Sequence, residues 1–141
     1  MTTLTTSAPK PRRTGRRPQI VIDAAQLAHL EDLAYGAETR QPELASVLLT
    51  ELARAKIVPT EKLPADVVTI GRPVTWRDET AGRTQSGTLV WPQEADIAAG
   101  RISVLTPIGV ALLGLKAGAA FDWTTRAGET RALSVLAVGA A

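Results

Sequence analysis

Residues that could support acid–base or metal chemistry are few and scattered along this 141-residue chain. The chain has one histidine, His29, and no cysteine, so a metal site built from imidazole and thiolate has too few ligands. We expect His29 to be a solvated side chain on a helix. Asp78 and Glu79 are adjacent acids, but neighbours on a strand point to opposite faces, so we expect them to flank a turn.

Sequence motifs of common enzyme classes are also missing. The chain contains no GxxxxGK[ST] loop, no GxSxG elbow and no HExxH helix. We expect Trp76, Trp91 and Trp123 to pack in the core and at its rim, with a ligand cage as the alternative. The sequence therefore predicts a protein that is not an enzyme, with no catalytic residue, no metal and no cofactor.

Composition and charge place most of the chain in one folded body. Hydrophobic residues make up 45% and charged residues 21%, as in ordinary globular proteins, and no apolar run is long enough to cross a bilayer. Five of the 16 basic residues lie in residues 1–18, which contain no acid and almost no large apolar side chain. We expect residues 1–18 to be a disordered basic arm with at most a weak nucleic-acid contact. The remainder is slightly acidic, and we expect a cytoplasmic monomer with no membrane contact.

Two amphipathic helices are predicted within residues 19–57. Asp23 matches a helix N-cap, with Gln26 in the capping-box position, and Pro42 can open the second helix. Apolar residues then recur at helical spacing in both segments, and the connection between them is short. The pattern predicts an antiparallel helical hairpin, each arm about 15 residues and roughly 22 Å long. The polar side of the second helix is expected to include Glu51 and Arg54.

The rest of the chain has the pattern of a sheet. Residues 58–65 contain two prolines and read as a connector, and from residue 66 apolar residues alternate with polar ones. About five strands with one inserted helix predict an α+β domain, residues 66–141, with an antiparallel sheet. Leu133, Val135 and Ala137 are expected to complete the last strand.

The segment 101–118 is the centre of this domain. A strand from Ile102 to Leu105 leads into a short helix that Thr106 can cap and Pro107 can begin, and Gly114 lies where that helix would end. A strand, turn and helix of this kind has one rigid shape. We therefore expect the neighbouring strands to be arranged around it.

Four short motifs in this order resemble the Rnk proteins, the regulators of nucleoside diphosphate kinase, in the GreA/GreB transcription-factor superfamily. The resemblance runs from about residue 19 to the C-terminus, and the residues that carry it are Leu63-Pro64-x-Asp66-Val67-Val68-Thr69, Val74 with Arg77, Thr88-Leu89-Val90 with Pro92, and Ile102-Ser103-Val104 with Pro107-Ile108-Gly109 and Ala111-Leu112-Leu113-Gly114-Leu115. It implies an FKBP-like C-terminal domain and a short N-terminal coiled coil.

The resemblance also implies a partner. In the superfamily the C-terminal domain docks on RNA polymerase at the secondary channel, on a coiled coil of the β′ subunit, and the hairpin enters the channel. On this basis we expect Ser103, Thr106, Pro107 and Ile108 to contact polymerase. Gre factors carry two acids at the hairpin tip that help bind a magnesium ion.

The tip residues of this chain are Glu38, Arg40 and Glu43. Because a carboxylate must lie about 2.0 to 2.6 Å from a metal, a hairpin this short is not expected to reach the active centre. We therefore expect a competitor of Gre factors that does not stimulate transcript cleavage. The alternatives are a direct regulator of nucleoside diphosphate kinase, a prolyl isomerase, and a DNA-binding helix-turn-helix that uses Arg54 and Lys56.

Overall fold

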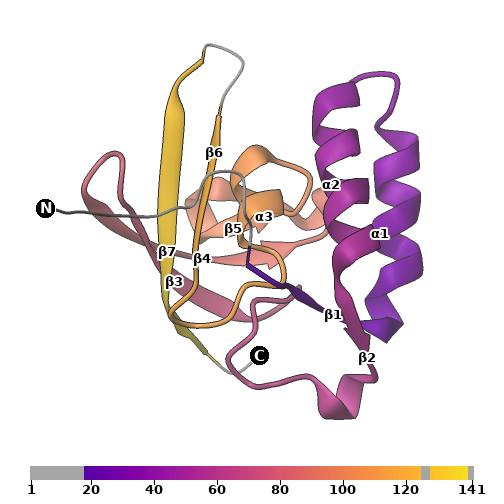
Figure 1. Cartoon of the computed structure of the whole chain (residues 1–141), viewed down its shortest axis with the longest axis horizontal. Helices are drawn as coiled ribbons and strands as arrows, with labels where there is room; N and C mark the ends of the chain where they lie inside the picture. The colour runs from indigo at the N-terminus through magenta and orange to yellow at the C-terminus, as the bar shows by residue number, and fades with distance from the viewer. Residues whose placement is uncertain (1–17, 125–127, 140–141) are drawn as a thin grey trace, which may run out of the picture.

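Two helices lie beside a β-sheet in the computed structural model, which describes residues 18–124 and 128–139 (Figure 1). Helix α1 (Ala24–Gly36) and helix α2 (Pro42–Arg54) run side by side in opposite directions. Strand β1 (Val21–Asp23) leads into α1, strand β2 (Lys56–Val58) follows α2, and the two strands pair in parallel at the base of the hairpin, the end opposite the connecting turn. The α+β class expected from the sequence is confirmed. The basic arm lies outside the described residues except for Pro18, and so does the side chain of Trp123.

Within the described residues, the main sheet has five strands in the order β5-β4-β3-β7-β6. These strands are β3 (Pro73–Asp78), β4 (Arg83–Val90), β5 (Arg101–Ser103), β6 (Ala120–Thr124) and β7 (Thr130–Val138). The expected all-antiparallel sheet is wrong in one respect, because β5 runs parallel to β4, with Thr88 opposite Arg101. Between β4 and β5 the chain forms two short 3-10 turns, η3 (Pro92–Glu94) and η4 (Ile97–Ala99). They bring Arg101, the first residue of β5, beside Thr88 of β4.

The start of α1 is tied to the loop that follows the helices. The Ala25 N–H donates to Asp23 Oδ1 at 2.9 Å, which confirms the expected N-cap, and the Thr60 hydroxyl donates to the same oxygen at 2.6 Å. Gln26 has a different role from the expected capping box, since its Oε1 accepts from the Thr69 hydroxyl at 2.9 Å. These bonds join the first helix to segments some forty residues further along.

Glu51 is not on the solvated side of α2, as the sequence suggested, because only 3% of it is exposed. Arg54 accounts for the difference: its Nη1 donates to Glu51 Oε1 at 2.9 Å, and its Nη2 donates to the Pro18 carbonyl at 2.6 Å. A carboxylate can be buried when a guanidinium lies against it. Arg54 is thereby engaged within the fold, which argues against its use as a DNA-phosphate contact in a helix-turn-helix.

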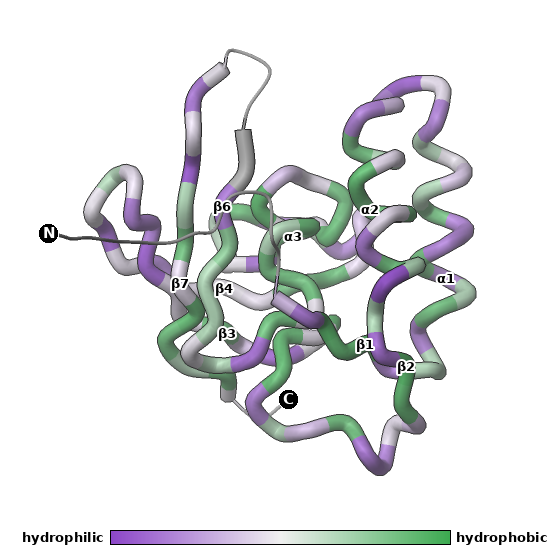
Figure 2. The backbone as a smooth tube through the Cα atoms, viewed as in Figure 1, coloured by the Kyte–Doolittle hydropathy of each residue, from purple (hydrophilic) through white to green (hydrophobic). Residues whose placement is uncertain are grey.

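The helices and the sheet share one hydrophobic core. Leu30 of α1 and Leu48 of α2 are fully buried in the same cluster as Trp76 and Leu112. Figure 2 shows hydrophilic and hydrophobic residues alternating along both helices, as expected for helices with one packed face. The hairpin is therefore packed against the sheet domain through its apolar side.

The base of the hairpin is interlocked with Gly114. The Val21 N–H donates to the Gly114 carbonyl at 3.1 Å, and the Gly114 N–H donates to the Val68 carbonyl at 2.9 Å. Gly114 has a φ of 83°, and a Cβ there would lie 2.7 Å from the Cβ of Ile20. Only glycine permits both this backbone and this close approach.

The last strand contains an irregularity that the alternating pattern did not predict. Leu133, Val135 and Ala137 all lie in β7, as expected, but Leu133 and Val135 are buried whereas Ala137 is exposed. The register of β3 against β7 shifts between Thr75 and Trp76, which inserts one extra residue in β7 and reverses the alternation after it. Leu136, at this shift, is 50% exposed.

Candidate functional site

A tight loop positions helix α3 (Pro107–Leu112) above the sheet. Thr106 caps the helix as predicted, because its Oγ1 accepts from the Gly109 N–H at 3.1 Å, while its hydroxyl donates to the Ser103 carbonyl at 2.8 Å. Ser103 Oγ in turn accepts from the Leu105 N–H at 3.1 Å. The side chains of Ser103 and Thr106 are thus occupied in holding the loop.

Gly109 allows this loop to fold so closely against the helix. A Cβ at Gly109 would lie 2.5 Å from the Ser103 carbonyl oxygen and 2.7 Å from that of Val104. Both contacts are with backbone atoms, which cannot rotate away. The distance between α3 and the end of β5 is therefore set by the absence of a side chain at this position.

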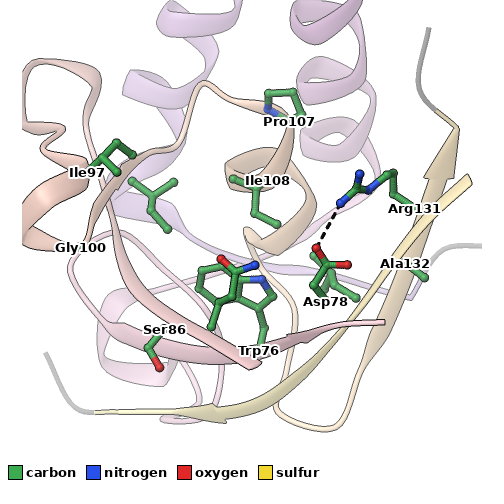
Figure 3. Close-up of a pocket in the computed structure, with 12 residues that line it drawn as sticks. Trp76, Asp78, Ser86, Ile97, Gly100, Pro107, Ile108, Arg131 and Ala132 are labelled. Carbon is green, nitrogen blue, oxygen red and sulfur yellow. Dashed lines mark hydrogen bonds and ion pairs between the residues drawn. The ribbon is translucent and has the colours of Figure 1, made fainter. Parts of the chain in front are cut away.

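A groove of about 600 Å³ lies between α3 and the sheet (Figure 3). Its lining comes from the four strands β3, β4, β5 and β7, the 92–100 segment and the first turn of α3: Trp76, Asp78, Gln85, Ser86, Ile97, Gly100, Ile102, Pro107, Ile108, Arg131, Ala132 and Leu133. Pro107 is exposed and Ile108 half-buried, and the latter's side chain points into the groove with that of Trp76. Of the four residues predicted to contact a partner, these two line the groove.

One end of the groove is polar. Arg131 Nη2 donates to Asp78 Oδ2 at 3.1 Å, and the Ala81 N–H donates to Asp78 Oδ1 at 3.0 Å (Figure 3 shows the ion pair). The hydrogen bond from Ala81, aided by the charge of Arg131, holds the pKa of Asp78 below its ordinary value of 3.8, against the opposing effect of burial. Glu79 lies on the other face, where it accepts from Arg77 and Ser134, so the expectation that the two acids diverge is confirmed.

This pKa shift predicts how acid affects stability. Because the folded-state pKa of Asp78 lies below 3.8, its carboxylate stabilises the fold above that pH, and the contribution is lost as the pH falls through the folded-state pKa. We expect Asp78→Asn to lower the free energy of unfolding at pH 7 and to flatten its decline as the pH falls below 3.8. Urea unfolding at a series of pH values measures this. Equal pH dependence in the two proteins would contradict it.

The predicted tip residues occupy a separate place. Glu38, Arg40 and Glu43 are exposed around the turn that joins α1 to α2, at the end of the hairpin opposite β1 and β2, and none of them lines the groove. Over residues 18–124 and 128–139, no three acidic or histidine side chains are grouped closely enough to hold a metal ion. No helix in that part of the chain has the length and apolar content needed to span a bilayer.

Sequence reasoning missed two contacts and one exposed apolar residue around the groove and the hairpin. His29 is exposed but stacks on Trp91, with ring centroids 3.8 Å apart, and so joins α1 to the end of β4. Asp78 and Arg131 are separated by 53 positions, and no local pattern connects them. Ile97 had a visible signal, since it is an isolated large apolar residue in a polar, alanine-rich stretch.

Comparisons with known proteins show which family this chain resembles. Residues 63–140 match the family described as "Transcription elongation factor, GreA/GreB, C-term", and residues 18–58 match "Rnk N-terminus". The chain is 32% identical over 120 residues to the regulator of nucleoside diphosphate kinase of Escherichia coli K12, covering 85% of this chain and 88% of that protein. It is 32% identical over 125 residues to the transcription elongation factor GreA of Azorhizobium caulinodans, covering 83% of this chain and 80% of that protein.

A solved structure is also similar. The GreA/GreB transcription elongation factor of Nitrosomonas europaea is 32% identical and superposes with a TM-score of 0.67, covering 87% of this chain and 99% of that one.

Proposed function

This chain belongs to the GreA/GreB transcription elongation factor family, with an N-terminal segment of the Rnk type, and from that membership we propose that it regulates transcription by binding RNA polymerase. The observation that carries the proposal is the family match over residues 63–140, which includes α3 and every residue that lines the groove. The docking surface we propose is Pro107 and Ile108 with the adjoining groove. An apolar centre with a polar surround is typical of a transient protein interface.

The role of the loop residues follows from their hydrogen bonds. Ser103 and Thr106 use their hydroxyls within the loop, so we assign them to positioning α3 rather than to contacting polymerase directly. Pro107, at the first helical position, and Ile108, beside it in the groove, are the apolar contacts. We propose that they bind the β′ coiled coil at the secondary channel, the site implied by the family.

The helices suggest what happens after docking. Each has 13 residues, which corresponds to roughly 20 Å at about 1.5 Å per residue. The tip residues Glu38, Arg40 and Glu43 would therefore stay near the channel mouth. We propose that the protein occupies the entrance, competes with Gre factors for it, and does not stimulate transcript cleavage.

A competition experiment tests this function. Purified chain is expected to bind core RNA polymerase, and an excess of it is expected to displace a labelled Gre factor and to reduce Gre-stimulated cleavage in a backtracked complex. The chain alone should leave cleavage at the intrinsic rate. Failure to bind polymerase, or binding together with the Gre factor, would contradict the proposal.

A second function is suggested by the name of a relative. The protein of Escherichia coli K12 is called a regulator of nucleoside diphosphate kinase, and the present chain covers 88% of it. Direct regulation would require binding to the kinase, so capture of purified kinase by immobilised chain, with core polymerase as the parallel sample, separates the two functions.

A further inference from the structure

We propose that the groove beside α3 binds a protein segment that carries an apolar side chain next to a carboxylate, with the apolar side chain held over Trp76 and the carboxylate bound by Arg131. This inference rests on the proposed function, since the partner is taken to be RNA polymerase. It adds the chemistry by which the partner segment is recognised.

The apolar half of the proposal rests on the solvent exposure of two isoleucine side chains that line the groove. Ile97 is 79% exposed at the rim of the groove, although it is one of the most hydrophobic residue types, and Ile108 is only half-buried on the opposite wall. Trp76 forms the floor between them and is 3% exposed. A volume of about 600 Å³ exceeds that of a single side chain, so a segment with one inserted residue fits. Covering Ile97 and Ile108 removes their apolar surface from water.

The polar half rests on an imbalance in the ion pair. Both oxygens of Asp78 already accept hydrogen bonds, from Ala81 and from Arg131. Among the described residues, Arg131 uses only Nη2 in that pair, and a guanidinium has five N–H donors. Its side chain is 37% exposed and lines the groove. This end of the groove therefore offers donors, and a carboxylate can accept them in a charge-assisted bond.

The same observations favour a protein segment over a nucleic acid. The walls are apolar, and outside residues 1–18 the 14 acidic residues outnumber the basic ones. A polyphosphate would meet one available guanidinium in a negatively charged body. A single carboxylate beside an apolar side chain matches both surfaces of the groove.

Four variants of the full chain test the recognition of core RNA polymerase by surface-immobilised binding. Ile97→Ser and Arg131→Gln are each expected to weaken binding about tenfold, as expected for a lost apolar contact and a lost charged hydrogen bond. Asp78→Asn is expected to strengthen binding about threefold, because it frees the Arg131 guanidinium. Arg101→Gln is the matched control, with the same change of charge at an exposed arginine of β5 outside the groove, and should bind like the wild type.

Arg131→Gln is expected to lower the affinity for polymerase and Asp78→Asn to raise it. This difference in direction separates a role of Arg131 in recognition from a role in supporting the fold. If Arg131 only supports the fold through Asp78, both variants will weaken binding alike, and the proposal is overturned. Wild-type affinity for both Ile97→Ser and Arg131→Gln would overturn it while leaving polymerase binding in place. No binding by the wild type would overturn this proposal and the proposed function together. Circular dichroism melting of each variant checks that it is folded.

Discussion

The double variant Pro107→Ala with Ile108→Asp is expected to bind core RNA polymerase at least about 30-fold more weakly than the wild type. Both residues lie at the start of α3 on the groove, where Pro107 is exposed and Ile108 half-buried. Loss of a central apolar contact at an interface costs about 2 kcal/mol, and an aspartate placed against an apolar partner adds a desolvation cost. Co-purification with core polymerase, followed by titration, measures the loss.

A matched variant controls for the effect of introducing aspartate. Leu136→Asp makes the same kind of exchange at a leucine that is 50% exposed on β7 and does not line the groove, so it should bind polymerase like the wild type. The fold should survive both changes, because Ile108 is only half-buried and its loss costs about 1 kcal/mol. Retained binding by the double variant would remove the docking surface from α3.

The variant Gly109→Ala is expected to lose about 3 kcal/mol of unfolding free energy and about 10 °C in melting temperature. Its new methyl group would lie within 2.8 Å of the Ser103 oxygen and of two backbone atoms of Val104. These atoms cannot withdraw easily, because the Ser103 carbonyl accepts from the Thr106 hydroxyl and the Val104 N–H donates to the Val90 carbonyl. Relief of the clash would require α3 to move off the sheet.

Gly36→Ala provides the comparison for this result. Gly36 is the last residue of α1, and a Cβ there would meet nothing within 4 Å. Alanine favours the helix and restricts the unfolded chain, so this variant should gain about 0.5 kcal/mol. Thermal and urea unfolding of both variants measure the contrast. A Gly109→Ala protein as stable as the wild type would show that the loop before α3 can open without cost.

Features encoded by neighbouring residues could be predicted from the sequence. The Asp23 and Thr106 caps and the helix starts at Pro42 and Pro107 all depend on spacings of a few residues. Such signals act through local hydrogen bonds and side-chain periodicity. They located α3, and with it Pro107 and Ile108 of the groove.

Features that depend on residues far apart in the chain could not be predicted from the sequence. The parallel pairing of β5 depends on how the 92–100 segment turns, and the burial of Glu51 depends on Arg54 and on Pro18 beyond the helix. The Asp78–Arg131 pair joins opposite ends of the sheet domain's sequence. No periodicity records such contacts, so the polar end of the groove emerges only in three dimensions.

The contacts that Ile20 and Val21 make with Gly114 limit where the hairpin of this chain can change in length. The base of the helices is fixed by the Val21 hydrogen bond to Gly114 and by the contact of Ile20 with the glycine. Residues added or deleted near that base would displace strands that must meet Gly114. We therefore expect changes in length to be tolerated best at the turn formed by residues 37–41, where matched insertions into both helices would lengthen the hairpin without disturbing its contacts with Gly114.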